Sequence, residues 1–241
     1  ADLYQDLRQG KVIRYKVTVP EGVRLSKILK IFSEELRLKH TLSQNIAPSS
    51  LRKILKISEK NLEGLFFPST YQYTSKISDI RLLLSAYNMM KRVMYTYWLN
   101  RAQHLPYKHP YEALVAASLI EMESGNHEES FKISRVLVNR IEKRMPLQID
   151  ATVRYGLNYW KKKLLHKHLQ INTMYNTYKR RGLPPTPIAC PGKNSIYAAL
   201  HPAKGNWLYF VSTGHGNHTF SRTLAKHNKA VKHLKKVKGI S

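Results

Sequence analysis

The chain contains a single cysteine, Cys190, in 241 residues, so no internal disulfide can form. A zinc site built from clustered cysteines is excluded for the same reason. The histidine pairs His166/His168 and His215/His218 each lack a third ligand at helical spacing. We therefore expect no metal and no cofactor.

Long apolar runs are also missing. The most apolar window, residues 113–120, is much shorter than the ~18 residues that a membrane-spanning helix requires. Residues 1–4 (ADLY) lack the charged start and apolar stretch of a signal peptide. The sequence opens without Met, which suits a mature product or a shortened version of a longer protein. With 42% hydrophobic residues, the chain can bury the core of one domain or of two modest ones.

Acidic residues are scarce: 15 Asp and Glu stand against 41 Lys and Arg, a formal net charge of +26. Such a charge favours a polyanionic partner, which could be nucleic acid, anionic lipid or an acidic glycan. A merely solvated basic surface is the alternative. The basic clusters at residues 161–163, 179–181 and 232–238 are not interleaved with the aromatic residues on which single-stranded nucleic acid stacks.

The first 60 residues predict a small α/β unit. Apolar residues alternate at period two across residues 13–19, which indicates a half-buried strand, and residues 20–22 (PEG) form a turn. Ser26 is expected to cap an amphipathic helix that ends near residue 36. Residues 41–50 are expected to be a polar loop.

The rest of the chain predicts a mostly helical domain that opens with an aromatic-rich loop at residues 62–71. Helices are expected at residues 78–101, after Pro110, at 129–143, near 195–200 and from Thr223, with one strand at 207–212. We therefore predict an α+β fold: a small N-terminal module at residues 1–60, then a mostly helical domain with a minor sheet at residues 61–241.

Glu121 stands out among the few acids. On a helix it shares one stripe with Leu114, Ala117 and Ser118, and an adjacent stripe is formed by Val115, Leu119 and Met122. This helix is apolar nearly all round and should be central, so Glu121 lies near the end of a buried helix. Desolvation there would raise the pKa of its carboxyl, as a general acid requires. The alternative is a structural Glu paired with Arg135 or Arg140.

Glu123 follows two residues later, about 200° round the helix, and cannot face Glu121 from the same helix. A glycosidase with two carboxylates would need its second carboxylate elsewhere in the chain, and Asp150 is the candidate.

Residues 175–178 and 182–189 combine amides, phenols and a proline-stiffened loop, which suits sugar rings; an ordinary surface loop is the alternative. Residues 201–204 and 214–221 are similar candidates, although Gly-His-Gly at 214–216 also fits a hairpin turn.

Several ordered motifs together resemble the endolytic murein transglycosylases of the MltG/YceG-like family, from about residue 12 to the C-terminus. The matching motifs are LEGLFFPSTY at residues 62–71, ASLIEME at 117–123, VNR at 138–140, LQIDATVRYG at 147–156, YNTY at 175–178, GLPPTPIACPG at 182–192, HPAK at 201–204, LYFV at 208–211 and FSRTLAKHN at 220–228.

The resemblance implies a LysM-like module at residues 1–60 and a catalytic domain at residues 61–241, with Glu121 as the catalytic acid. Such an enzyme cleaves the bond between N-acetylmuramic acid and N-acetylglucosamine and leaves 1,6-anhydro ends, using one carboxyl and no metal. The residues expected to bind substrate or to support the site are Ser118, Glu123, Asn139, Arg140, Gln148, Asp150, Thr152, Tyr155, Tyr175, Asn176, Thr177, Tyr178, Pro184, Pro185 and His201.

The sequence departs from the family pattern at Met122, where Lys is common, at Ala151, where Pro is usual, and at Cys190, where a small or polar residue is usual. None of these positions is the expected acid, so the departures concern substrate preference rather than the reaction.

Family members carry an N-terminal membrane anchor that this chain does not contain. We therefore expect the soluble part of a protein on the periplasmic face of the bacterial inner membrane. Its expected partners are peptidoglycan glycan strands and the anionic membrane surface, with no specific nucleic acid; coupling to peptidoglycan synthases would suit a strand terminase, but no residue demonstrates it. The alternatives are a peptidoglycan-binding module without turnover, a nucleic-acid-binding protein and a hydrolytic muramidase.

Overall fold

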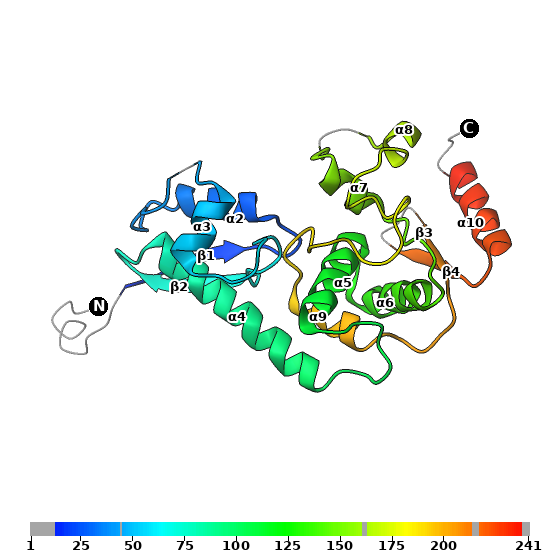
Figure 1. The fold of residues 1–241 in the computed structure, drawn as a ribbon, viewed down its shortest axis with the longest axis horizontal. Coiled ribbons are helices and arrows are strands. Elements are labelled where there is room, and N and C mark those ends of the chain that lie inside the picture. Colours follow the sequence, from blue (N-terminus) through cyan, green and yellow to red (C-terminus); the bar gives the residue numbers. More distant parts are fainter. Residues whose placement is uncertain (1–12, 44, 161–162, 214–216, 238–241) are drawn as a thin grey trace.

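The computed structural model describes residues 13–43, 45–160, 163–213 and 217–237 (Figure 1). In chain order the elements are β1 (Arg14–Val19), α2 (Leu25–Glu34), α3 (Pro48–Leu55), β2 (Ser69–Thr74), α4 (Asp79–Leu99), α5 (Pro110–Glu123), α6 (His127–Glu142), α7 (Asp150–Gly156), α8 (His166–Leu169), α9 (Lys193–Leu200), β3 (Tyr209–Ser212), β4 (His218–Ser221) and α10 (Leu224–Val237). The predicted mixture of helices with a minor sheet is confirmed. Over the described residues, no helix is both long enough and apolar enough to cross a membrane.

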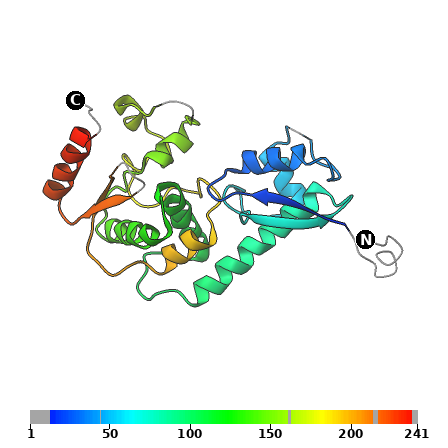
Figure 2. The same ribbon diagram turned by 180° about the vertical axis from the view of Figure 1, so that it is seen from behind.

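An N-terminal unit is built on the antiparallel pair β1–β2, in register from Arg14 opposite Thr74 to Val19 opposite Ser69. The predicted alternation holds at Val17 and Val19, which are buried between exposed neighbours, whereas Ile13 is exposed and precedes the strand. Helices α2 and α3 lie between the two strands in sequence, and α4 runs from this unit to the helical part of the molecule (Figures 1 and 2). The sheet joins residues on both sides of the boundary predicted at residue 60.

Three local predictions in this unit are wrong. Residues 69–71, expected in a loop, lie in β2, because β1 supplies their hydrogen-bonding partners. Helix α3 begins inside the expected polar loop, with Pro48 in its first turn, where the absent N–H costs nothing. Ser26 is not a cap: α2 begins at Leu25, whose backbone N–H donates to Glu63 Oε1 at 2.7 Å, so the cap comes from a distant residue.

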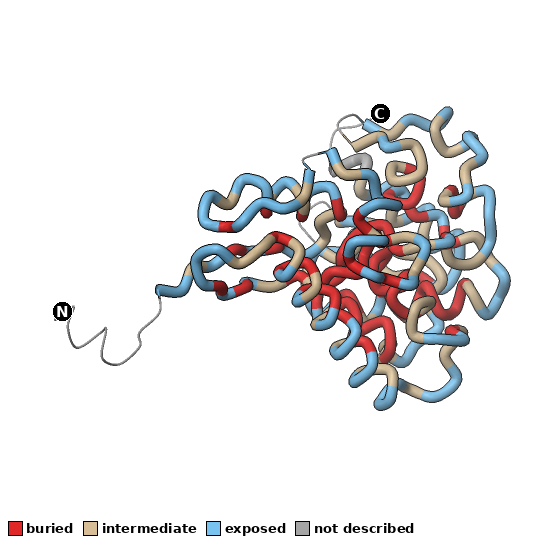
Figure 3. Tube along the Cα trace, turned by 60° about the vertical axis from the view of Figure 1, so that its left-hand side comes forward, coloured by how far each residue is buried: buried red, intermediate tan, exposed pale blue. Residues whose placement is uncertain are grey.

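Helix α5 is the centre of the larger part, as predicted. Every residue from Ala113 to Ile120 is buried, and α5 packs against α4, α6, α7 and α9. Ala116 and Ala117 on α5 and Ala198 and Ala199 on α9 are fully buried, and such small side chains allow close approach of two helices. Figure 3 shows the buried residues concentrated in this helical part.

The C-terminal part holds the antiparallel pair β3–β4, against which α10 packs. The predicted strand at 207–212 begins at Tyr209, while β4, α7 and α8 were not predicted. The Gly-His-Gly segment between β3 and β4 lies outside the described residues, as do Lys161, Lys162 and Lys238 of the basic clusters. Helix α4 begins as expected, with the Ser78 hydroxyl accepting from the Arg81 N–H.

Candidate active site

Glu121 lies in the last turn of α5 and is half-buried. Its Oε2 accepts a hydrogen bond from the backbone N–H of Gly192 at 2.9 Å. Gly192 is the N-cap residue of α9, so the carboxylate meets the positive end of a helix dipole, which favours negative charge. The site therefore joins the C-terminus of one buried helix to the N-terminus of another.

A cavity of about 190 Å³ opens beside Glu121. Its other lining residues are Glu21, Ser124, Gly125, Asn126, His127, Ser130, Asn194 and Ser195. The Ser124 and Ser130 hydroxyls share a hydrogen bond at 2.8 Å, and Asn194 Nδ2 donates to Ser130 Oγ at 2.9 Å. This lining of hydroxyl, amide and imidazole groups suits a polyhydroxylated ligand.

The sequence did not predict this lining. The sequence indicates only a turn at Glu21, and residues 124–127 carry no recognisable signal of a site. Partial burial of the Glu21 carboxyl, together with the neighbouring Glu121 carboxylate, raises the pKa of Glu21. The one available signal was the scarcity of acids in the chain, because an acid within a turn is otherwise unremarkable.

Glu123 has surroundings different from those of Glu121, as the helical spacing predicted. Burial, and then the nearby Asp150 charge, raise the pKa of Glu123 to about 8. Asp150, the first residue of α7, accepts from the Tyr178 O–H at 2.6 Å. Glu123, Asp150 and Tyr178 therefore form a second acidic cluster, separate from the cavity beside Glu121.

The two arginines considered as partners of Glu121 bind backbone oxygens instead. Arg140 Nε donates to Leu208 O at 2.6 Å, and its Nη1 donates to Leu147 O at 2.8 Å. Nη1 also reaches Pro146 O and Gln148 Oε1, at 3.0 and 3.1 Å. Arg135 donates through Nε to Ala203 O. The alternative that pairs Glu121 with Arg135 or Arg140 is therefore wrong.

Several predicted substrate-binding residues have their polar groups satisfied inside the protein. Asn139 Nδ2 donates to Trp207 O at 2.8 Å, which holds the entry to β3. The Ser118 hydroxyl bonds Val115 O and the Ile188 N–H. The Thr152 and Thr177 hydroxyls share a hydrogen bond, and Asn176 Nδ2 donates to Leu169 O and Ile171 O. These hydrogen bonds hold loops in place, which suits the supporting role expected of these residues; contact with a ligand stays a prediction.

The Tyr175 and Pro184 segments, expected to bind substrate or to support the site, do not line the cavity beside Glu121. The Tyr175 ring packs against Tyr155 with centroids 4.7 Å apart, and its hydroxyl shares a hydrogen bond with Thr186 Oγ1. Pro184 is buried and Pro185 is exposed.

His201 is likewise occupied by local contacts. Its ring stacks on Tyr197, and its Nε2 lies 2.8 Å from Asn100 O. This places it at the junction of α9 with the residues that follow α4.

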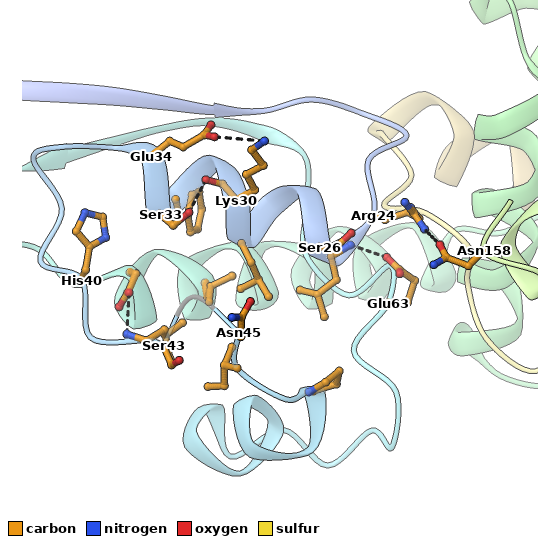
Figure 4. A pocket seen from close by; sticks show the side chains of 18 of the residues that line it. Arg24, Ser26, Lys30, Ser33, Glu34, His40, Ser43, Asn45, Glu63 and Asn158 are labelled. Atoms are coloured by element: carbon orange, nitrogen blue, oxygen red, sulfur yellow. Dashed lines mark hydrogen bonds and ion pairs between the residues drawn. The ribbon is translucent and has the colours of Figure 1, made fainter. Parts of the chain in front are cut away.

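A larger groove, of about 1120 Å³, runs along α2 toward α7 (Figure 4). Glu63 lies on its wall, where Figure 4 shows it below Ser26 and beside the hydrogen-bonded pair Arg24 and Asn158. The Tyr155 O–H donates to Glu63 Oε2 at 3.4 Å, so Glu63 links the start of α2 to α7. Burial raises the pKa of Glu63 to about 7.

The raised pKa of Glu63 predicts a pH dependence of stability. The folded state holds this proton more tightly than the unfolded state, so the free energy of unfolding falls as pH rises from about 4.5 to about 7. The change attributable to Glu63 is on the order of 3 kcal/mol. Glu63→Gln keeps an acceptor for the Leu25 N–H and should flatten this fall, raising the melting temperature at pH 8 and changing it little at pH 4.5. If the melting temperatures of the two proteins changed in parallel with pH across this range, the assignment to Glu63 would be contradicted.

Within the described residues, no three His, Cys, Asp or Glu side chains gather in a group that could hold a metal ion.

The comparisons with known proteins point to one family. A model of the YceG-like family matches residues 1–233. The endolytic murein transglycosylase of Bacillus subtilis (strain 168) is 36% identical over 236 residues, which cover 90% of this chain and 64% of the relative. The protein of the same name from Streptococcus pneumoniae (strain ATCC BAA-255 / R6) is 28% identical over 246 residues, 88% of this chain and 44% of the relative.

A crystal structure of a YceG-like protein from Listeria monocytogenes superposes with a TM-score of 0.70 at 29% identity. The match covers 93% of this chain and 79% of the Listeria chain. The present chain spans less than two thirds of the length of the two curated relatives.

Proposed function

Because this chain belongs to the YceG-like family, we propose that it is an endolytic lytic transglycosylase that cleaves the glycan strands of peptidoglycan. The observation that carries the proposal is the placement of Glu121. Its carboxyl is half-buried, faces a polar cavity and is held by a backbone N–H rather than by a guanidinium. The proposal assigns to this carboxyl both the donation and the recovery of a proton.

The proposed reaction uses this carboxyl twice. In its acid form, Glu121 protonates the glycosidic oxygen between N-acetylmuramic acid and N-acetylglucosamine, and the bond from that oxygen to C1 breaks. The resulting carboxylate, stabilised by the Gly192 N–H, accepts the proton of the muramyl C6 hydroxyl. The C6 oxygen bonds to C1, which closes a 1,6-anhydro ring and restores the acid. Glu121 thus donates one proton and recovers one, and no water is consumed.

The remaining predicted residues divide into two roles. Glu123, Asp150 and Tyr178 form an acidic cluster on the other side of α5, with Gln148 exposed nearby, and are proposed to contact distal sugars or stem peptides. Asn139, Arg140 and the buried threonines are proposed to hold the loops that carry these groups.

The N-terminal unit is proposed to be a LysM-like module that extends to Thr74. Support comes from its strand-helix-helix-strand order and from the antiparallel pairing of β1 with β2. The groove along α2, with its mixture of hydroxyl, amide and apolar side chains, would then contribute to glycan binding.

Action outside the cytoplasmic membrane follows from the proposed substrate. The net charge of +26 suits a glycan that bears carboxylates on its peptide stems, and also an anionic membrane surface. The proposed action is the termination of nascent strands, which would suit an association with peptidoglycan synthases.

Digestion of purified sacculi tests the proposal. Mass spectrometry of the released and residual glycan should reveal new 1,6-anhydromuramyl ends that accumulate with time. Binding to sacculi without new ends would instead indicate a peptidoglycan-binding module. New reducing ends would indicate a hydrolytic muramidase and would also overturn the proposal.

A further inference from the structure

We propose that Glu21, carried by the N-terminal unit, is a second carboxylate of the reaction centre, which stabilises the positive charge that develops on the cleaved sugar. The inference rests on the proposed function and extends it. It makes the N-terminal unit a part of the active site rather than a separate binding module.

The turn that carries Glu21 is fastened to the segment before α9. The Gly22 N–H donates to Cys190 O at 2.9 Å, and the Cys190 N–H donates back to Val23 O at 2.8 Å. Gly22 has a φ of +71°, a left-handed conformation that favours glycine, and a Cβ there would lie 3.8 Å from Glu121 Cγ. The backbone after β1 is thus held directly beside the catalytic candidate.

The same helix N-terminus holds both carboxylates. The Gly192 N–H donates to Glu121 Oε2, and the Lys193 N–H hydrogen-bonds Glu21. A Cβ on Gly192 would lie 1.8 Å from Glu21 Oε1, so the carboxylate of Glu21 occupies the space that any side chain at position 192 would need. Two adjacent residues of one helix therefore fix two acids from parts of the chain 100 positions apart.

Placing the Glu21 carboxylate beside that of Glu121 costs free energy, because the Glu121 charge opposes ionisation of Glu21. The charged groups around Glu21 are Glu121 on α5 and His127 at the start of α6, and only His127 favours the anionic form. In a chain with 15 acids among 241 residues, such a pair at a cavity mouth is unexpected for a purely structural contact.

Cleavage of a glycosidic bond passes through a state with positive charge shared between C1 and the ring oxygen. In the proposed reaction, Glu121 donates its proton to the leaving oxygen and is not available to stabilise this charge. A carboxylate that lines the same cavity can stabilise this charge without forming a bond. A fixed charge of opposite sign lowers the activation free energy, because it is already in place when the charge develops.

Glu21→Gln tests the inference, since the amide keeps the shape and an acceptor for the Lys193 N–H but removes the charge. We expect kcat for anhydro-end formation to fall about 10- to 100-fold, with KM within about twofold and no loss in melting temperature. The pH profile of kcat should lose the acidic limb that Glu21 contributes. Glu21→Asp, which keeps the charge, should retain that limb and recover part of the rate.

Glu142→Gln, an exposed acid on α6, is the matched control and should match the wild type. Wild-type kcat and pH profile in Glu21→Gln would overturn the inference. So would a lower melting temperature with an unchanged pH profile, because that result would assign Glu21 a structural role. If the wild type itself forms no anhydro ends, the proposed function fails first, and the two failures are distinguishable.

Discussion

Glu121→Gln should lower the rate of anhydro-end formation on sacculi by about 1000-fold, within the range that general acid–base catalysis contributes. The amide can still accept from the Gly192 N–H through its oxygen, so the local structure should persist. It can neither protonate the glycosidic oxygen nor take the proton of the C6 hydroxyl, so both halves of the reaction should fail. Mass spectrometry of glycan ends at several enzyme concentrations measures the loss.

Two controls show whether the loss of rate in Glu121→Gln comes from the missing carboxyl. Binding of the variant to sacculi should remain close to the wild-type level, because uncharged contacts with the glycan are retained. Glu142→Gln removes an exposed acid from the adjoining helix and should leave the rate unchanged. A Glu121→Gln protein that released anhydro ends at the wild-type rate would assign the acid to another residue, of which Glu123 would be the first to test.

Arg140→Ala should lower the free energy of unfolding by about 3 kcal/mol, since it removes a buried cation and leaves carbonyl oxygens without their donor. Arg140 donates to Leu208 O, Pro146 O and Leu147 O, and so joins α6 to the loop before α7 and to the start of β3. Chemical denaturation with a fluorescence readout gives the value.

Arg140→Lys separates charge from geometry in this cluster. A lysine keeps the positive charge but cannot bond both loops with a planar fork, so we expect an intermediate loss of stability. Arg81→Ala, an exposed arginine on α4, should change stability by less than about 0.5 kcal/mol. If Arg140→Ala lowered stability no more than Arg81→Ala does, the hydrogen bonds of Arg140 would contribute nothing to stability.

Long periodic elements could be predicted from the sequence. Helices α4 and α5 have 21 and 14 residues with sustained apolar spacing, and Ser78 marks the start of α4. Strand β2 could not be predicted, because its pairing partner β1 lies 54 residues earlier at Val17 opposite Tyr71 and at similar separations along the ladder. The N-terminus of α2 could not be predicted for a related reason, since its acceptor is Glu63 rather than a neighbouring hydroxyl.

The candidate site likewise contains residues that the sequence could identify and residues that it could not. Glu121 is unusual in its own local sequence, an acid at the end of an apolar helix, and that anomaly is visible without a structure. Asn176 and Thr177 looked equally suitable for sugars, but their side chains bond loop backbone, which only the tertiary structure reveals. Glu21 and Asn194 reach the cavity through chain folding alone, and no local pattern distinguishes them.

The pairing of β1 with β2 limits how this protein can be divided. A fragment that began at residue 61, the start of the predicted catalytic domain, would retain β2 but lose its only strand partner within the described residues. The hydrogen-bonding groups of β2 would then be unsatisfied, and the buried rings of Tyr71 and Tyr73 would lose the apolar cover of the N-terminal unit. Such an edge invites association between copies. The shortest useful fragment for biochemistry therefore begins before Arg14.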